Sequence, residues 1–198
     1  DASEKEFIDR LKKADVVFFT GGSQIRLTAL IGGSPFIDLI KQKLKKEDFI
    51  YAGTSAGAAA ASDAMIYQGK PEKALLKGEI QISHGFGLVQ DVVFDTHFIN
   101  RGRIGRLFQI VTSNPSVLGI GLEENSALLI SGSRLESIGP GMTIVVDGHN
   151  IKNSNLLEIK EGVPLSIDGL SLHVMSKTDV FDLMTRRLTI LTPEDCKI

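Results

Sequence analysis

A serine set between two glycines is the residue of this sequence best suited to nucleophilic chemistry. The segment Gly53-Thr54-Ser55-Ala56-Gly57 fits the pattern G-x-S-x-G, in which glycines permit a sharp strand-to-helix turn that exposes the serine hydroxyl. An apolar segment precedes it and a run of alanines follows, as that turn requires. The backbone N–H of Ala56 would then face a developing oxyanion at the helix N-terminus. The alternative interpretation is a turn that only caps an alanine-rich helix.

A serine nucleophile needs a base, and His97 is the best placed of the four histidines. It follows the apolar residues 92–94, so we expect it at the C-terminal end of a strand, on the same rim of the sheet as Ser55. Without Ser55, His97 would be interpreted as a half-buried structural histidine. For the other three histidines we expect surface or structural roles, because they lie near turns or in a late strand: His84, His149 and His173.

A carboxylate should complete the site by accepting a hydrogen bond from the second imidazole nitrogen. Glu123 and Glu124 follow the apolar residues 119–122 directly. Successive residues in an extended segment point to opposite faces, so we expect one of the two glutamates to reach His97. The order Ser, His, Glu differs from the Ser, Asp/Glu, His order of the α/β-hydrolases, which argues against a lipase or esterase.

Three arginines follow the histidine closely, namely Arg101, Arg103 and Arg106. Arg103 and Arg106 would share one face of a helix. Guanidinium groups hold carboxylates by paired hydrogen bonds, so the cluster indicates a carboxylate-rich substrate. An isolated cluster of this kind would instead be a solvated basic face.

A glutamine near the N-terminus is a further candidate for substrate contact. Gln24 follows Gly21-Gly22-Ser23 at the end of a predicted strand. The sequence there lacks the G-x-x-x-x-G-K-[ST] pattern, which argues against a phosphate-binding loop.

Helices and strands alternate through the first half of the sequence, and these elements must position the candidate residues. Residue spacing and β-branched or aromatic runs predict a helix over 4–13, a strand over 16–19, a short helix over 25–31, a helix from Pro35 to about residue 45 and a strand over 49–52. Ser34 is the expected cap of the 35–45 helix. Short, continuously apolar strands between helices are typical of a parallel sheet covered on both faces.

The second half of the sequence changes character. A strand over 92–94, a helix over 101–112 and strands around Leu118 and Ala127 are followed by short strands between turn signals: Gly139-Pro140-Gly141, Asp147-Gly148 and Asp168-Gly169. Such turns predict antiparallel hairpins. The fold class is therefore α/β, with a largely parallel doubly wound sheet and antiparallel hairpins in the C-terminal third.

Composition predicts one soluble globular domain. The 198 residues are 42% hydrophobic, and a formal net charge of −2 with dispersed basic residues argues against nucleic-acid binding. No apolar run approaches the roughly 20 residues that cross a bilayer, and the first residues lack a signal-peptide pattern, so we expect a cytoplasmic protein without a membrane partner. The single cysteine, Cys196, permits neither an internal disulfide nor a cysteine-based zinc site.

Four motifs taken together resemble the cyanophycinases. They are Gly21-Gly22-Ser23-Gln24, Gly53 to Ala58, Asp95-Thr96-His97-Phe98 with the three arginines, and Gly119 to Ala127. They occur in the family's order and approximate spacing across most of the chain. The wider family also contains the aspartyl dipeptidases, and the arginine-rich segment favours the cyanophycinase branch.

The resemblance implies a serine exopeptidase that releases β-aspartyl-arginine dipeptides from cyanophycin, a polymer with an aspartate backbone bearing arginine. It implies a glutamine amidotransferase-like fold (class I), a homodimer, and no metal or other cofactor. Carried onto matching positions, Ser55 is the nucleophile, His97 the general base and Glu124 the orienting acid. The substrate pocket would be lined by Gln24, Asp95, Thr96, Arg101, Arg103 and Arg106. Asp95 would either meet a substrate guanidinium or hold one of the arginines.

The sequence departs from the family in two places. Thr96 stands where cyanophycinases usually carry glutamine, which shortens or removes a substrate contact and makes a related β-aspartyl peptide the alternative substrate. The family's first strand and glycine-rich loop, with a second oxyanion amide, do not precede Asp1. We therefore expect residues 1–198 to form a single peptidase domain lacking that segment, which is either absent or associated as a separate piece. The alternative functions are an aspartyl or isoaspartyl dipeptidase and a non-catalytic peptide-binding homologue.

Overall fold

The computed structural model describes residues 2–192, which form two compact units. The first unit comprises residues 2–68 and 81–94, and the second comprises residues 69–80 and 95–192. Cys196 lies outside the described residues, and the single peptidase domain expected over residues 1–198 stays a prediction.

Residues 4–60 of the first unit have the helix–strand alternation that the sequence predicts, and two strands that were not predicted follow. The elements of this unit are α1 (Lys5–Lys12), β1 (Val16–Phe19), α2 (Gln24–Ile31), α3 (Pro35–Lys46), β2 (Ile50–Gly53), α4 (Ala56–Ala59), β3 (Ala64–Gln68), β4 (Gln81–His84) and the first part of β5 (Val92–Thr96). Helix α3 begins as expected, because the Ser34 hydroxyl accepts a hydrogen bond from the Ile37 N–H at 3.4 Å and Pro35 occupies the first turn.

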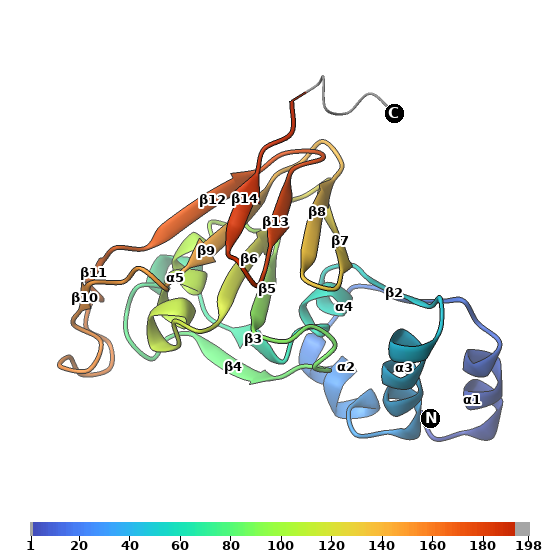
Figure 1. The fold of residues 1–198 in the computed structure, drawn as a ribbon. Coiled ribbons are helices and arrows are strands. Elements are labelled where there is room, and N and C mark those ends of the chain that lie inside the picture. Colours follow the sequence, from blue (N-terminus) through green and yellow to red (C-terminus); the bar gives the residue numbers. More distant parts are fainter. Residues whose placement is uncertain (1, 193–198) are drawn as a thin grey trace. The chain divides into compact units, whose positions relative to one another are not determined.

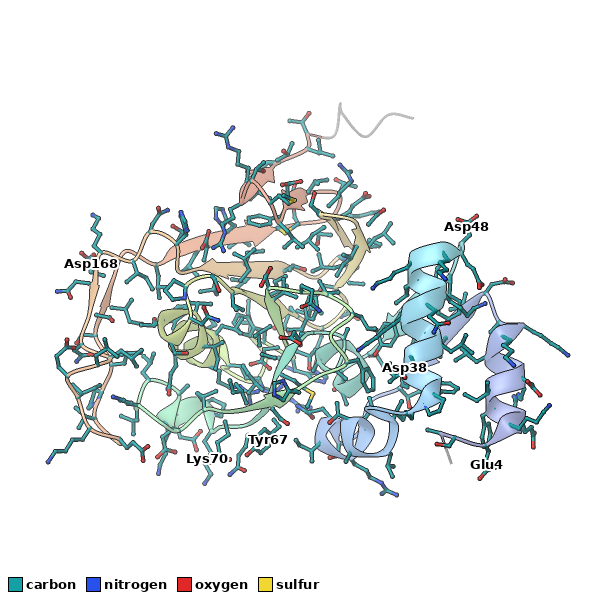
Figure 2. The ribbon with its side chains drawn as sticks, turned by 60° about the horizontal axis from the view of Figure 1, so that its bottom comes forward. Glu4, Asp38, Asp48, Tyr67, Lys70 and Asp168 are labelled. Carbon is teal, nitrogen blue, oxygen red and sulfur yellow. The ribbon has the colours of Figure 1, made fainter. Side chains whose placement is uncertain are left out.

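Two strands of the first unit pair in parallel. β1 pairs with β2 from Val16 opposite Ile50 to Phe19 opposite Gly53. Helices α1 and α3 lie side by side (Figure 1), with charged residues such as Asp38 on the exposed surface of α3 (Figure 2). The buried core consists of Leu11, Phe19, Ile37, Ile40, Phe49, Ala59, Ala60, Met65 and Phe86. Burial of each large apolar side chain contributes about 1.5–3 kcal/mol, and Tyr51 of β2 packs against this core.

The second unit is built mainly from antiparallel strands, with two helical segments, η1 (Pro71–Lys73) and α5 (Ile104–Ser113). One four-stranded sheet has the order β12-β9-β6-β5, and the residues of β5 that belong to the second unit are Asp95 and Thr96. The other has the order β14-β13-β8-β7. The strands are β6 (Leu118–Leu122), β7 (Ala127–Ser131), β8 (Arg134–Ile138), β9 (Thr143–Asp147), β10 (Asn153–Ser154), β11 (Ile167–Asp168), β12 (Ser171–Met175), β13 (Val180–Asp182) and β14 (Arg187–Thr189).

The mixed α/β class is confirmed, but antiparallel pairing is more extensive than predicted. Among the pairings described, β1–β2 and a single bridge between Ser62 and Val89 are parallel. The antiparallel pairings include β3–β4 in the first unit and β6–β9, β9–β12, β7–β8 and β8–β13 in the second. The β7–β8 hairpin, in which Gly132 (φ +57°) reverses the chain, lies in the region predicted to be antiparallel, whereas β3–β4 was not predicted.

The helix predicted over residues 101–112 is shorter at its start. It begins at Ile104, so Arg101 precedes it and Arg103 is its N-cap residue. Gly102, with φ +61°, interrupts the helical backbone at that point. Within residues 2–192, no helix is long and apolar enough to cross a membrane.

Candidate active site

Ser55 lies at a strained turn between β2 and α4. Its backbone has φ 52° and ψ −108°, a conformation that costs a residue other than glycine of order 1–3 kcal/mol. The two flanking glycines are required by close backbone approach: a Cβ at Gly57 would lie 2.4 Å from the Phe19 carbonyl oxygen, and one at Gly53 would lie 2.4 Å from the Gly57 carbonyl carbon. The predicted context of strand, turn and short helix is confirmed.

A tyrosine of β2 is hydrogen-bonded to the same turn. The Tyr51 hydroxyl donates a hydrogen bond to the Gly57 carbonyl at 2.6 Å. Burial raises the pKa of Tyr51, so the hydroxyl keeps its proton and remains a donor. The turn that carries Ser55 is thus restrained by the close backbone approaches at Gly53 and Gly57 and by this hydrogen bond from Tyr51.

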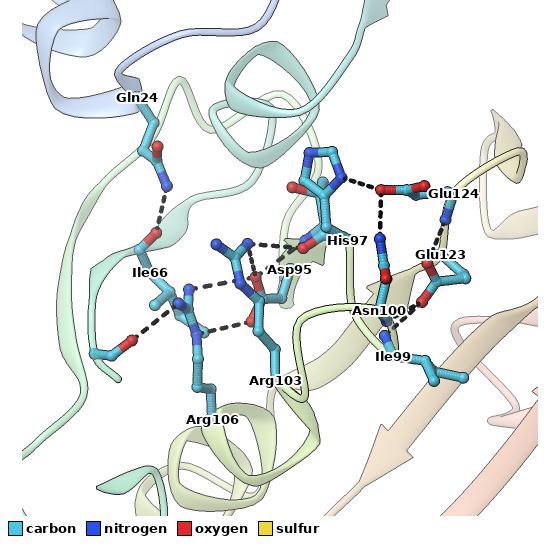
Figure 3. Close-up of polar contacts among 12 residues, drawn as sticks. Gln24, Ile66, Asp95, His97, Ile99, Asn100, Arg103, Arg106, Glu123 and Glu124 are labelled. Carbon is cyan, nitrogen blue, oxygen red and sulfur yellow. Dashed lines mark hydrogen bonds and ion pairs between the residues drawn. The ribbon is translucent and has the colours of Figure 1, made fainter. Parts of the chain in front are cut away.

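The Gly21-Gly22 segment of the first unit approaches the Ser55 side chain. A Cβ built on Gly21 would lie 3.3 Å from Ser55 Cβ and 3.8 Å from Ser55 Oγ. Gln24 begins α2, and its side-chain amide nitrogen donates to the Ile66 carbonyl at 3.0 Å (Figure 3). The predicted substrate contact of Gln24 stays a prediction, while its amide nitrogen contacts the backbone of β3.

In the second unit, His97 contacts Glu124. Its Nδ1 lies 3.2 Å from Glu124 Oε1, and the Asn100 side-chain amide donates to the same oxygen at 2.8 Å (Figure 3). Hydrogen bonds from Asn100 and His97 hold the pKa of Glu124 below its ordinary value, so this carboxylate is ionised at neutral pH. Of the two glutamates that the strand pattern left open, Glu124 is the one bonded to His97.

Glu123 is bonded to backbone instead. Its Oε2 accepts hydrogen bonds from the N–H groups of Ile99 and Asn100, and its Oε1 accepts one from the N–H of Glu124 at 2.8 Å. Desolvation raises the pKa of Glu123, but these backbone hydrogen bonds outweigh it and leave the pKa below its ordinary value. Sequence reasoning missed both Asn100 and these bonds of Glu123, because no motif marks contacts between segments more than twenty residues apart.

Asp95 pairs with two of the three arginines. Its Oδ1 accepts from Arg103 Nη1 at 3.2 Å, from Arg106 Nη2 at 3.3 Å and from the Thr96 N–H at 3.0 Å. Arg106 Nε also lies 2.9 Å from Asp95 Oδ2, close enough for an ion pair although the two atoms do not meet hydrogen-bond geometry. Desolvation raises the pKa of Asp95 and lowers that of Arg106, since burial disfavours both charges.

The structure distinguishes the three arginines by burial. Arg106 is 5% exposed and also donates to the Gly69 carbonyl at 3.2 Å, whereas Arg103 is partly buried and donates to the Thr96 carbonyl at 2.7 Å. Arg101 is exposed. Of the two roles open for Asp95, holding arginines in place is the one that its contacts match. Substrate contacts stay predictions for the five residues of this segment: Asp95, Thr96, Arg101, Arg103 and Arg106.

The remaining histidines lie where the sequence predicts. His84 ends β4 and is exposed, His149 lies in the turn after β9, and His173 lies in β12 with its ring 5.2 Å from that of Phe181. Among residues 2–192 no group of three or more His, Cys, Asp and Glu side chains is arranged to hold a metal ion.

Most of the chain is similar to known peptidases. The model of "Peptidase family S51" matches residues 1–138. Cyanophycinase of Synechococcus elongatus is 32% identical over 189 residues, covering 95% of this chain and 59% of that protein. Cyanophycinase of Trichormus variabilis is 34% identical over 177 residues, covering 89% of this chain and 59% of that protein. The chain therefore spans about three fifths of the length of these relatives.

Solved structures of peptidases share the fold. A peptidase from an acI-B1 Actinobacterium has a TM-score of 0.58 and 22% identity, covering 88% of this chain and 64% of that one. A putative peptidase E protein from Listeria monocytogenes has a TM-score of 0.50 and 18% identity, covering 70% of this chain and 68% of that one.

Proposed function

Because this chain belongs to peptidase family S51, we propose that it is a serine exopeptidase that hydrolyses cyanophycin to β-aspartyl-arginine dipeptides through Ser55, His97 and Glu124. The observation that carries the proposal is the 3.2 Å contact between His97 Nδ1 and Glu124 Oε1. A carboxylate at Nδ1 favours the tautomer with its proton there, which leaves Nε2 as the basic nitrogen. That is the nitrogen a serine nucleophile needs.

Each residue has a defined part in the proposed reaction. Ser55 Oγ attacks the peptide carbonyl carbon while His97 Nε2 accepts its proton, and His97 then donates that proton to the leaving amine. Glu124 stabilises the imidazolium that forms in between. The Ala56 N–H donates to the oxyanion, and one such donor is worth about 3 kcal/mol of barrier. Water then hydrolyses the acyl-enzyme by the same steps in reverse order, so no metal takes part.

The charge around Asp95 supports recognition of carboxylates. One carboxylate is shared by Arg103 and Arg106, so the cluster keeps a net positive charge with its guanidinium groups held in fixed directions. Fixed guanidinium groups lose less rotational entropy when they bind a carboxylate. We propose that Arg103 and the exposed Arg101 contact the carboxylates of the substrate and that Arg106 and Asp95 hold Arg103, with Gln24 and Thr96 lining the same pocket.

Thr96 favours a second candidate, an aspartyl or isoaspartyl dipeptidase that acts on short peptides. Threonine is shorter than the glutamine usual at this position in the cyanophycinases, so a contact with the polymer would be weakened. A non-catalytic peptide-binding homologue is the third candidate. The whole protein is proposed to have a doubly wound fold of the class I glutamine amidotransferase type, to form a homodimer in the cytoplasm and to include or bind an N-terminal segment with a second oxyanion donor.

The test is release of β-aspartyl-arginine from purified cyanophycin, with a panel of short β-aspartyl peptides assayed alongside. We expect release that a chelator leaves unchanged and that falls by about 10,000-fold or more in Ser55→Ala. Hydrolysis of the short peptides alone would favour the dipeptidase. Binding without turnover, repeated with a full-length protein, would favour the non-catalytic homologue.

A further inference from the structure

Glu123 joins the end of β6 to the loop that carries His97. This histidine loop, residues 97–103, follows β5 and ends where α5 begins. Both carboxylate oxygens of Glu123 are used: Oε2 accepts from the N–H groups of Ile99 and Asn100, and Oε1 accepts from the N–H of Glu124. Bonds from backbone N–H groups to an ionised carboxylate are about twice as strong as neutral ones.

Packing supports the same connection beneath the loop. Phe98 is fully buried, and its N–H donates to the Leu122 carbonyl at 3.2 Å. A Cβ at Gly121 would lie 2.1 Å from the Phe98 ring, so glycine is required there for the ring to fit. The ring sets how far the loop lies from β6, while Glu123 sets its orientation through directional bonds.

The need for such positioning follows from the exposure of Glu124. Its side chain is 50% exposed, so packing alone leaves its carboxylate free to rotate. Two donors from the histidine loop converge on its Oε1, the Asn100 amide at 2.8 Å and His97 Nδ1 at 3.2 Å. The backbone of Asn100 is one of the groups that Glu123 holds.

We propose that Glu123 is a positioning residue, which fixes the histidine loop so that His97 and Asn100 together orient the Glu124 carboxylate (Figure 3). This inference rests on the proposed roles of His97 and Glu124. Glu123 acts through these residues and contacts neither substrate nor the reacting atoms. Its effect on catalysis therefore passes through Glu124.

The test compares Glu123→Gln with Asp179→Asn. Asp179 is the control in the second unit, because its carboxylate accepts two backbone N–H bonds, from Ser176 at 2.8 Å and Leu191 at 3.1 Å, compared with three for Glu123. In Glu123→Gln one acceptor oxygen becomes an NH₂ donor facing an N–H group. We expect kcat to fall by about 10- to 100-fold with KM within about twofold, and we expect kcat of Asp179→Asn to stay unchanged.

A double-mutant cycle separates positioning from a merely structural role. If Glu123 acts through Glu124, then adding Glu123→Gln to Glu124→Gln lowers kcat by less than about threefold further. A full 10- to 100-fold further loss would overturn the inference, as would equal losses of kcat in Glu123→Gln and Asp179→Asn.

A measurement independent of turnover distinguishes failure of this inference from failure of the proposed function. In Glu123→Gln we expect faster hydrogen exchange at the amides of Ile99 and Asn100 and a shifted NMR signal of His97 Nδ1, with both unchanged in Asp179→Asn. These results would support the positioning role even if no peptide were hydrolysed. Unchanged exchange and an unchanged His97 signal in Glu123→Gln would contradict it.

Discussion

The turn at Ser55 and the loop at His97 both contain a residue with positive φ, and they are held by different means. Ser55 has φ 52° and His97 has φ 53°, and neither is glycine. The Ser55 turn is held by shape, since Gly53 and Gly57 permit backbone contacts that any Cβ would prevent. The His97 loop is held by charge, since Glu123 binds its backbone N–H groups and Glu124 its imidazole. The proposed nucleophile thus depends on small residues and the proposed base on carboxylates.

The largest effect on kcat should follow when the Glu124 carboxylate beside His97 is replaced by a neutral group. Glu124→Gln keeps the size of the side chain but places a neutral amide opposite His97 Nδ1, so the developing imidazolium loses its stabilisation. We expect kcat to fall by about 1,000-fold with little change in KM, measured on whichever β-aspartyl substrate the wild type hydrolyses. Glu136→Gln is the control, because Glu136 pairs with Arg134 on β8. A loss of kcat below tenfold would show that Glu124 does not stabilise the imidazolium of His97.

In the turn that carries Ser55, the largest effect on the free energy of unfolding should come from the methyl group added in Gly57→Ala. In Gly57→Ala the added Cβ would lie 2.4 Å from the Phe19 carbonyl oxygen, so β1 or the turn must move. We expect the free energy of unfolding to fall by about 3 kcal/mol, measured by urea titration. Gly132→Ala is the control: its Cβ meets nothing within 4 Å, and the positive φ alone costs about 1 kcal/mol. Equal losses of unfolding free energy in Gly57→Ala and Gly132→Ala would show that close packing at Gly57 is not the cause.

Substitutions in the His97 loop and in the Ser55 turn should also differ in how their effect on stability depends on pH. The pKa of Glu123 in the folded chain is below its ordinary value of 4.5, so its bonds add stability above that pH and lose it as the pH falls through the lowered pKa. The destabilisation by Glu123→Gln should therefore be smaller at about pH 3 than at about pH 7, with the decrease confined to pH values below about 5, whereas that by Gly57→Ala should stay constant. Urea titrations at both pH values measure this. A destabilisation by Glu123→Gln that is independent of pH would contradict the charge-based account of the loop.

The smallest effect concerns the space beside the serine. In Gly21→Ala the new Cβ would lie 3.3 Å from Ser55 Cβ, so the serine side chain must shift by a few tenths of an ångström. Gly21 is exposed, so we expect the free energy of unfolding to change by less than about 1 kcal/mol and kcat to fall by about threefold to tenfold. Unchanged kcat would show that Ser55 tolerates this crowding.

Local signals made the first unit largely predictable. Ser34 followed by Pro35 marks the start of α3, and the apolar residues 49–52 and the G-x-S-x-G pattern mark β2 and the Ser55 turn. In the second unit, turn signals predicted the antiparallel hairpins, but the partner of each strand was not predictable, because sequence shows that a chain turns and not which strands then pair. The start of α5 was placed too early because Arg101 and Arg103 are good helix formers that the backbone at Gly102 overrides.

Candidate residues were predictable where a motif carries them, and their contacts were not. The alternation of strand residues reduced the acid to Glu123 or Glu124, and the resemblance implied Glu124. The structure shows that Glu124 bonds His97, and the bonds of Glu123 to the loop were not predicted. For Asp95 the sequence left two alternatives open, contact with a substrate guanidinium or pairing with an arginine of the chain, and the structure shows pairing with Arg103 and Arg106. Asn100 escaped prediction because its contact with Glu124 joins residues 24 positions apart.

Reaction of Ser55 with a serine-directed fluorophosphonate tests the central claim most directly, because it needs no assumption about substrate. Mass spectrometry would locate the adduct in the wild type, in His97→Ala and in Ser55→Ala. We expect a single adduct on Ser55, formed at least about 100-fold more slowly in His97→Ala and more slowly at acid pH as His97 takes up a proton. An adduct on another serine, or equal rates in wild type and His97→Ala, would contradict the assignment of Ser55 and His97 as nucleophile and base.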